Sequence, residues 1–168
     1  LVITSPPYWN AVTYDKSKNI NDYEKYLDEL VEIFLECERV LRPNGKLVIN
    51  TPLMPIPQDV IKQDVRHLKD ISSDLSTLLI NKSNLNLYST YIWKKQTSKL
   101  MFGSYPYPGN LLENNTIEFI RTYVKPGKSK KYQQYVKDHN KLKRYEWIDL
   151  TQQIWFMMPE DVNRKKNH

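Results

Sequence analysis

The chain has 168 residues, of which 40% are hydrophobic and 12% aromatic, so it is expected to form one folded domain or part of one rather than a disordered chain. Its formal net charge is +6, and its one cysteine, Cys37, excludes an intrachain disulfide framework and suits a reducing, cytoplasmic environment. The sequence contains no apolar run long enough to cross a membrane and no basic-then-apolar leader, so no membrane partner is predicted.

A short buried strand is predicted at residues 1–4, and a stiff polar and aromatic segment follows it: Ser5, Pro6, Pro7, Tyr8 and Trp9. The two prolines fix φ at about −65°, lack an N–H group and push the residue before each toward extended conformations. The carbonyls of Ser5 and Pro6 are therefore free to accept hydrogen bonds, and the Ser5 hydroxyl lies beside them. Acceptors next to an aromatic platform describe a pocket for the exocyclic amine of a planar ring.

The segment Thr4-Ser5-Pro6-Pro7-Tyr8-Trp9 resembles the catalytic motif [S/D/N]-P-P-[Y/F/W] of the amino-methylating DNA methyltransferases. Pro-Pro-aromatic segments also occur in extended polyproline ligands, but the preceding strand and the following helix favour the methyltransferase interpretation. The resemblance implies S-adenosyl-L-methionine as the cofactor, double-stranded DNA as the partner and a base flipped out of the duplex.

By the same resemblance, Ser5, Pro6, Pro7 and Tyr8 are the expected catalytic residues, and Tyr8 and Trp9 are expected to stack on the base. Ser5 and the Pro6 carbonyl would accept hydrogen bonds from the amine and orient its lone pair. Serine at the first motif position favours N4 of cytosine over N6 of adenine, and the family context suggests a restriction-modification system.

Next, apolar residues at helical spacing predict a helix from Asn21 or Asp22 to about Leu41, with an acidic face toward solvent. A turn at residues 42–45 and a strand at residues 46–50 follow. The strand, helix and strand form a βαβ crossover, which implies two neighbouring parallel strands with the motif at their carboxyl ends.

Three prolines predict a loop at residues 51–58, and leucine spacing predicts a helix at residues 64–81. Strands at residues 85–94 and 116–125 are expected to pair as an antiparallel hairpin with a long loop, an order that resembles the later sheet motifs of the same family. The predicted fold class is therefore α/β. Residues 1–125 would form part of a Rossmann-like methyltransferase sheet, with parallel strands, crossover helices and a C-terminal antiparallel hairpin.

Residues 126–168 form a basic segment, interpreted as the start of a DNA-recognition region. The stretch from residue 125 to residue 144 has a local charge balance of +7, and its basic residues are the predicted DNA contacts: Lys125, Lys128, Lys130, Lys131, Lys137, Lys141, Lys143 and Arg144. The alternative is a solvated loop. The apolar segments 146–149 and 153–159 are expected to be short strands or a core plug. His67, His139 and His168 have no neighbours suited to a metal site.

The sequence departs from the family in its glycines, since Gly45, Gly103, Gly109 and Gly127 form no Phe-x-Gly-x-Gly or G-x-G-x-x-G segment. The main cofactor-binding motif is thus expected beyond His168 or on another chain, and the start at Leu1 suggests a fragment that is inactive by itself. Two alternatives stay open. The chain would be a non-catalytic nucleic-acid-binding fragment or subunit, or a methyltransferase of RNA or a protein amide, because Asn-Pro-Pro-Tyr motifs serve those substrates.

Overall fold

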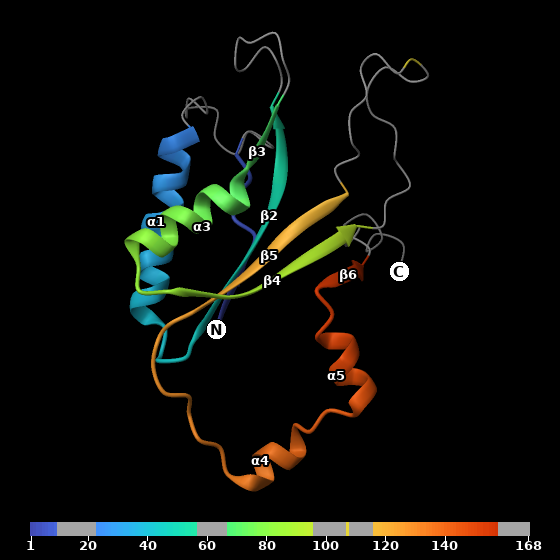
Figure 1. The fold of residues 1–168 in the computed structure, drawn as a ribbon. Coiled ribbons are helices and arrows are strands. Elements are labelled where there is room, and N and C mark those ends of the chain that lie inside the picture. The colour runs from blue at the N-terminus through green and yellow to red at the C-terminus, as the bar shows by residue number, and fades with distance from the viewer. Residues whose placement is uncertain (10–22, 57–66, 96–106, 108–115, 158–168) are drawn as a thin grey trace, which may run out of the picture.

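The computed structural model describes residues 1–9, 23–56, 67–95, 107 and 116–157 (Figure 1). Its strands form a sheet in the order β1-β2-β5-β4-β6, and β3 pairs with β2 outside this path. In chain order the strands and helices are β1 Val2–Thr4, α1 Tyr23–Val40, β2 Lys46–Ile56, β3 His67–Asp70, α3 Ile71–Lys82, β4 Asn86–Lys95, β5 Ile117–Val124, α4 Gln134–His139, α5 Arg144–Leu150 and β6 Ile154–Met157. Among the described residues, no helix is both long and apolar enough to span a membrane.

The first strand and helix confirm the predicted crossover. β1 pairs in parallel with β2, so that Val2 lies opposite Leu47 and Thr4 opposite Ile49, and α1 connects the two strands. The apolar face of α1 packs with α3 and with one face of β2, and the side chains of this core are less than one-tenth exposed: Leu27, Leu30, Val31, Phe34, Leu47, Ile49, Ile71, Leu75 and Leu79. Both helices lie on the same side of the sheet (Figure 1).

The predicted hairpin of the two later strands is also confirmed. β4 and β5 pair antiparallel from Asn86 opposite Val124 to Lys94 opposite Ile117, with a register irregularity between Leu87 and Ser89. β5 additionally pairs antiparallel with β2, so it is inserted between β2 and β4. As a result β1, β2 and β4 all run in one direction and their carboxyl ends lie at the same end of the sheet.

The loop predicted for residues 51–58 is wrong over residues 51–56, because β2 continues to Ile56. Its pairing with β5 ends at Pro52, opposite Glu118, and from Leu53 onward β2 pairs with β3 instead. Among the described strands, this outer part of β2 pairs with β3 alone. A proline costs little on a strand edge without a partner, because its missing N–H need not face a neighbour. Residues 57 and 58 lie outside the described residues.

The helix predicted for residues 64–81 begins later than expected, since His67–Asp70 forms β3 and α3 starts at Ile71. The Asp70 side chain accepts hydrogen bonds from the Ser73 backbone N–H at 3.1 Å and from the Ser73 hydroxyl at 2.7 Å. An aspartate N-cap of this kind satisfies amide groups that have no partner within the helix. The leucine spacing identified the helix, whereas the cap determines its first residue. Residues 64–66 lie outside the described part.

After β5 the chain forms an arm, residues 126–153, which carries α4 and α5 away from the sheet before β6 returns to pair in parallel with β4 (Figure 1). No residue of α4 or α5 is buried. The core role expected for segments 146–149 and 153–159 is therefore wrong where they are described. The first segment is helical, and Trp147 and Phe156 are 62% and 64% exposed. The second segment contains the short strand β6, which confirms the other predicted alternative there, and among its described residues only Trp155 is partly covered. The Trp155 ring stacks on Tyr91 with 4.6 Å between the ring centroids.

Lys125 is a predicted DNA contact, but its side chain points into the fold. Its ammonium group donates to the carbonyls of Glu38 at 2.7 Å and Leu41 at 2.9 Å, at the C-terminal end of α1. The last carbonyls of a helix have no partner within the helix, and the negative end of the helix dipole attracts a cation. Lys125 is therefore a helix cap that joins α1 to the end of β5, which corrects its assignment as a DNA contact.

Replacing this ammonium group should destabilise the fold. In the full-length protein, we expect Lys125→Met to lower the free energy of unfolding by about 1–3 kcal/mol, because it leaves several helix carbonyls without a donor. Lys128→Met is the matched control, since Lys128 is exposed and its replacement should change stability by no more than about 0.5 kcal/mol. Urea unfolding measures both, and equal midpoints for the two variants would contradict the capping role.

Candidate active site

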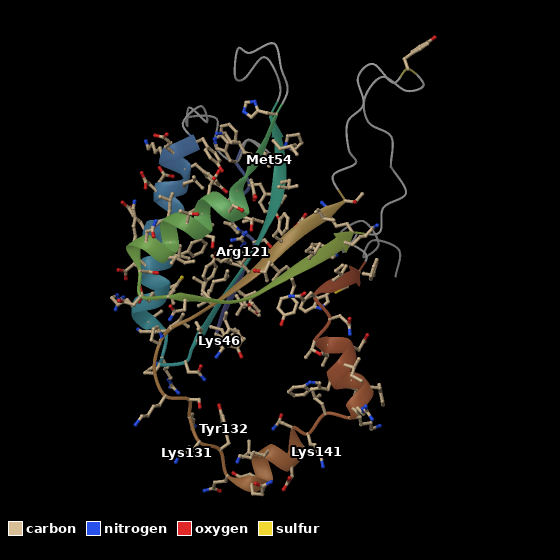
Figure 2. The ribbon with its side chains drawn as sticks, in the orientation of Figure 1. Lys46, Met54, Arg121, Lys131, Tyr132 and Lys141 are labelled. Atoms are coloured by element: carbon tan, nitrogen blue, oxygen red, sulfur yellow. The ribbon has the colours of Figure 1, made fainter. Side chains whose placement is uncertain are left out.

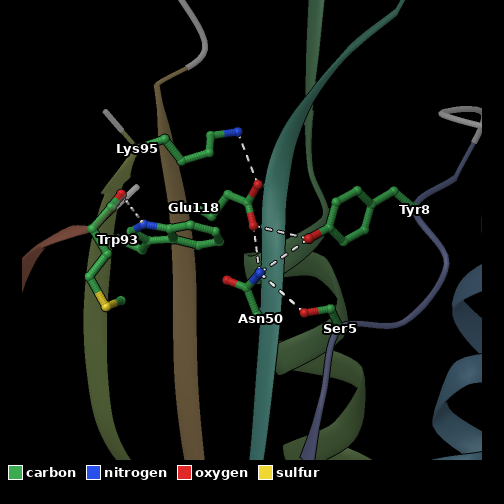
Figure 3. Close-up of polar contacts among 7 residues, drawn as sticks. Ser5, Tyr8, Asn50, Trp93, Lys95 and Glu118 are labelled. Carbon is green, nitrogen blue, oxygen red and sulfur yellow. Dashed lines mark hydrogen bonds and ion pairs between the residues drawn. The ribbon is translucent and has the colours of Figure 1, made fainter. Parts of the chain in front are cut away.

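The candidate site lies at the carboxyl ends of β1 and β2, where the motif leaves the sheet (Figure 3). Ser5 and Tyr8 come from the motif, Asn50 from β2, Lys95 from the end of β4 and Glu118 from the start of β5. Four separate parts of the chain thus meet at one end of the sheet. Their side chains are joined by hydrogen bonds and one ion pair, which we call the Glu118 network.

Glu118 is the centre of this network and is only 6% exposed. Its Oε2 accepts a hydrogen bond from the Tyr8 hydroxyl at 3.0 Å and another from Asn50 Nδ2, while Oε1 forms an ion pair with Lys95 Nζ at 2.9 Å. A buried carboxylate is costly unless it is paired and hydrogen-bonded, and here both oxygens have partners. The network therefore compensates for the burial of this charge.

Asn50 extends the network to the rest of the motif. Its Nδ2 is also within hydrogen-bond distance of the Tyr8 hydroxyl, at 3.1 Å, and of Ser5 Oγ, at 3.3 Å. The Glu118 carboxylate fixes the orientation of the amide, because only its NH₂ group can donate to a carboxylate. Within the described part of the chain, Asn50 Oδ1 is buried without a hydrogen-bond partner.

Tyr8 is half-buried, and its phenol is held as a hydrogen-bond donor. Burial raises the pKa of Tyr8 well above its ordinary value, and the negative charge of Glu118 and its hydrogen bond raise the pKa further. The hydroxyl therefore stays protonated at neutral pH and donates to Glu118. Because the hydroxyl is anchored in this way, the Tyr8 ring has a defined position beside Ser5.

The two proline carbonyls of the motif differ in their partners. The Pro7 carbonyl accepts a hydrogen bond from the Tyr26 hydroxyl of α1 at 2.9 Å, and burial raises the pKa of Tyr26 to about 12. The Pro6 carbonyl has no hydrogen-bond donor among the described residues. Pro7 thus attaches the motif to the helix. Pro6 itself is a buried residue, and the role of its carbonyl as an acceptor for a ligand stays a prediction.

Trp9 does not occupy the position that its expected stacking role requires. It is 5% exposed, belongs to the hydrophobic core and meets the Tyr23 ring edge-on with centroids 5.1 Å apart. A ring buried to this extent has no face open to a base. Trp9 therefore fixes the motif to α1 by packing, which corrects the prediction that it stacks on the target base.

The structure does not bring the predicted basic contacts together with the motif. Apart from Lys125, all of them are exposed on the arm, at or beyond the far end of β5 from Glu118: Lys128, Lys130, Lys131, Lys137, Lys141, Lys143 and Arg144. In Figure 2, Lys131 and Lys141 lie near α4, far from the carboxyl ends of β1 and β2. Lys130 and Lys143 lie over the rings of Tyr132 and Tyr145, at 5.6 Å and 5.8 Å.

Three members of the network were missed from the sequence: Asn50, Lys95 and Glu118. Asn50 was interpreted only as the last residue of a strand, although polar residues at the carboxyl end of such a strand are typical of a site. Glu118 carried a second signal, since it is the one polar residue in the otherwise apolar and aromatic stretch at residues 117–120. Its partner Tyr8 is 110 positions away, so only the fold reveals the contact.

The arrangement offers hydrogen-bond acceptors beside an aromatic ring. Ser5 is exposed, and the hydrogen bond from Asn50 occupies only one of the two acceptor positions of the Ser5 hydroxyl. The Ser5 hydroxyl can therefore still accept a hydrogen bond from a ligand. Among the described residues, no group of three or more histidine, cysteine or acidic side chains is placed to hold a metal ion. The site is thus suited to a planar molecule that donates N–H groups.

Comparison with known proteins identifies the family of this chain. A family model for DNA methylases of the N6/N4 type matches residues 1–168. The Type II methyltransferase M.MjaVI of Methanocaldococcus jannaschii is 24% identical over 163 residues, which cover 92% of this chain and 74% of that protein. A Thermus thermophilus protein assigned as a DNA modification methylase, solved with S-adenosyl-L-methionine, has a TM-score of 0.72 and 27% identity, over 96% of this chain and 59% of that one.

PvuII DNA methyltransferase, which is cytosine-N4-specific, has a TM-score of 0.62 with 14% identity, over 96% of this chain and 51% of that one, and so bears on the fold alone. These solved structures confirm the predicted α/β, Rossmann-like methyltransferase fold. The chain spans about 60% of the length of the Thermus thermophilus relative. Because the family model matches the chain from residue 1 to residue 168, this protein belongs to the N6/N4 DNA methylase family.

Proposed function

We propose that this chain carries the base-binding half of a cytoplasmic DNA methyltransferase that methylates the exocyclic amine of a flipped base in double-stranded DNA, with N4 of cytosine favoured. The observation that carries the proposal is the position of the exposed Ser5 hydroxyl, which contacts Asn50, beside the anchored ring of Tyr8. The Pro6 carbonyl follows Ser5 directly in the chain, and we propose it as the second acceptor. Family membership supplies the reaction class. A restriction-modification system is the proposed setting.

Exocyclic amines of bases are weak nucleophiles because their lone pair is delocalised into the ring. Hydrogen bonds from the amine to Ser5 Oγ and the Pro6 carbonyl would rotate the lone pair out of the ring plane and stabilise the positive charge that develops on nitrogen. Tyr8 would stack on the flipped base and replace part of the stacking lost from the duplex. S-adenosyl-L-methionine, when bound, supplies an activated methyl group on a sulfonium ion.

The cofactor requires a binding segment that this sequence does not contain in its usual form. Its four glycines are isolated from one another, so none forms a glycine-rich loop after a strand. We place that segment beyond His168 or on another chain. Strand β1, where Ile3 is 70% exposed, is next to the motif and lies at the edge of the sheet that the described strands form, with β2 as its one strand partner among them.

The arm is the proposed DNA-binding surface. β5 has eight residues, and each adds about 3.3 Å, so the arm begins about 25 Å from Glu118. The phosphates of one DNA strand are about 3.4 Å apart along the helix axis, so this distance corresponds to roughly seven of them. The arm then returns along the sheet, and β6 ends beside Lys95, where Trp93 Nε1 donates to the Met157 carbonyl at 3.0 Å. A duplex that lies along the arm would therefore contact lysines over its length and reach the site at one end.

A second candidate is a non-catalytic nucleic-acid-binding subunit, and the lack of a glycine-rich loop favours it. Titration of S-adenosyl-L-methionine into the full-length protein by calorimetry separates the two. Binding that saturates at one cofactor per active site supports the enzyme, and no heat of binding supports the non-catalytic subunit.

The Tyr8 ring should be needed for methyl transfer rather than for folding. Stacking contributes about 1–3 kcal/mol per base, so we expect Tyr8→Ala to reduce kcat/KM on duplex DNA by about 10- to 100-fold. Tyr88→Ala serves as the control, because Tyr88 is 65% exposed on β4 and lies outside the Glu118 network. Unchanged turnover of the Tyr8 variant would remove Tyr8 from the site.

Neutralising the first lysines of the arm should weaken binding to every DNA sequence. For the triple variant Lys128→Gln, Lys130→Gln and Lys131→Gln, the slope of log affinity against log salt should fall by roughly 0.9 for each DNA phosphate that the protein no longer neutralises. The control is a triple variant with the same change in charge outside the arm: Lys25→Gln, Lys69→Gln and Lys82→Gln. It should keep the wild-type slope of log affinity against log salt. If both triples behave alike, the arm is a solvated loop.

The methylated base tests the reaction and its target together. DNA methylated by the full-length enzyme is digested to nucleosides, and these are separated and identified by mass. We expect N4-methylcytosine, because the first motif residue is Ser5 rather than aspartate or asparagine. N6-methyladenine without N4-methylcytosine would overturn the cytosine preference but keep the reaction class, and no methylated amine at all would contradict the proposed function.

A further inference from the structure

Tyr8 and Asn50 both donate to one carboxylate, and Asn50 in turn contacts Ser5. Glu118 is thus linked directly or through one residue to two catalytic candidates, yet it is itself buried. Lys95 is the one basic side chain paired with it among the described residues, and both partners are largely covered, with side-chain exposures of 20% and 8%. The question is what this charge does for the site.

Among the described residues, the contacts of the motif with α1 act on its backbone and on Trp9. β1 ends at Thr4, so no strand pairing holds the residues that follow it, and the motif is attached to α1 by packing of Trp9 and by the hydrogen bond from Tyr26 to Pro7. These contacts fix the backbone but leave the Tyr8 ring free to turn about its side-chain bonds. The hydrogen bond of Tyr8 to Glu118, at 3.0 Å, fixes the position of the hydroxyl and hence the axis of the ring. Because a phenolic O–H prefers to lie in the plane of its ring, the direction of this hydrogen bond also favours one ring plane.

Glu118 also determines which acceptors the Asn50 amide donates to. The amide has two N–H groups and three oxygens within reach, those of Glu118, Tyr8 and Ser5. Glu118 Oε2 has the shortest contact and therefore sets the amide plane, which directs the remaining N–H toward Ser5 and Tyr8. With one lone pair of Ser5 Oγ occupied from this side, the remaining acceptor position of Ser5 faces away from Asn50, toward the exposed side of the motif.

We propose that Glu118, through Tyr8 and Asn50, is the positioning residue of the methyl-transfer site: it sets the plane of the stacking ring and the direction in which Ser5 accepts a hydrogen bond from the target amine. This inference rests on the proposed function. Glu118 touches neither the base nor the cofactor, so its effect is on the geometry of the reacting groups. A displacement of about 1 Å in such groups can cost about a hundredfold in rate.

The test compares Glu118→Gln with Glu38→Gln in the full-length enzyme. Glu38 is a matched control because it is also a buried glutamate, 8% exposed, but lies at the far end of α1, where it accepts the Asn84 N–H. We expect Glu118→Gln to lower the single-turnover rate constant of methyl transfer by about 10- to 100-fold. The affinity for DNA should change by less than about twofold. Glu38→Gln should leave both constants near their wild-type values.

A second pair of measurements distinguishes positioning from a purely structural role. Tyr8→Phe keeps the ring but removes its hydroxyl, so the double variant with Glu118→Gln should be no slower than the slower single variant. Biosynthetic 3-fluorotyrosine provides a signal that does not depend on activity. The ¹⁹F resonance of Tyr8 is identified by its absence from the spectrum of Tyr8→Phe. Its chemical shift should change in Glu118→Gln and stay the same in Glu38→Gln. If Glu118→Gln does not fold, Tyr8→Phe alone carries the kinetic test.

The outcomes separate this inference from the function on which it rests. If the wild-type enzyme methylates DNA and Glu118→Gln keeps the wild-type kcat, or if the rate effects of Glu118→Gln and Tyr8→Phe simply multiply, Glu118 does not act through Tyr8 and the positioning role is overturned. If the wild-type enzyme forms no methylated amine in DNA, the proposed function fails and the positioning role fails with it. A slower kcat with a displaced ¹⁹F resonance and non-additive rates supports both.

Discussion

The antiparallel insertion of β5 between β2 and β4 is the constraint on which the site depends. Because β5 runs against its neighbours, its first residues lie at their carboxyl ends, and Glu118 is paired opposite Pro52 and Trp93. The same register places Asn50 opposite Ile120, so Asn50 and Glu118 are diagonal neighbours on one face. A slip of one residue would turn Glu118 to the other face and separate it from Tyr8.

Alternation along β2 keeps the polar network apart from the apolar core. Ile49 and Thr51 are each 2% exposed on the face that α1 and α3 cover, so Asn50 between them points to the opposite face. Glu118 lies on that second face, where its charge is compensated by Lys95 and two hydrogen-bond donors rather than placed against leucine and isoleucine. One strand thus contributes both to the core that fixes the sheet and to the network that fixes the motif.

The sequence predicted the elements whose signals are local and missed the contacts that are not. The strand, helix and strand up to Asn50 and the later hairpin follow from hydrophobic spacing, and they are confirmed. The three prolines predicted a loop because proline is disfavoured inside sheets. The sequence does not reveal that this part of β2 has one strand partner only among the described strands, where proline is tolerated. Trp9 and Lys125 were assigned by residue type, and each has a packing or capping role that depends on α1. Glu118 belongs to a network assembled from four segments, and no spacing rule connects them.

The arm differs from the rest of the described chain in what its residues contribute. α4 and α5 bury none of their side chains, and only β6 at its end is paired with the sheet. Residues such as Trp147 and Ile148 would lower solubility if they stayed in water, and nothing in the described fold covers them. Lys125, by contrast, belongs to the basic segment by sequence, but its ammonium group caps the C-terminal end of α1. The arm's exposed lysines and aromatic rings are the residues that we propose to contact DNA, and the fold up to residue 125 would then supply the site that such binding serves.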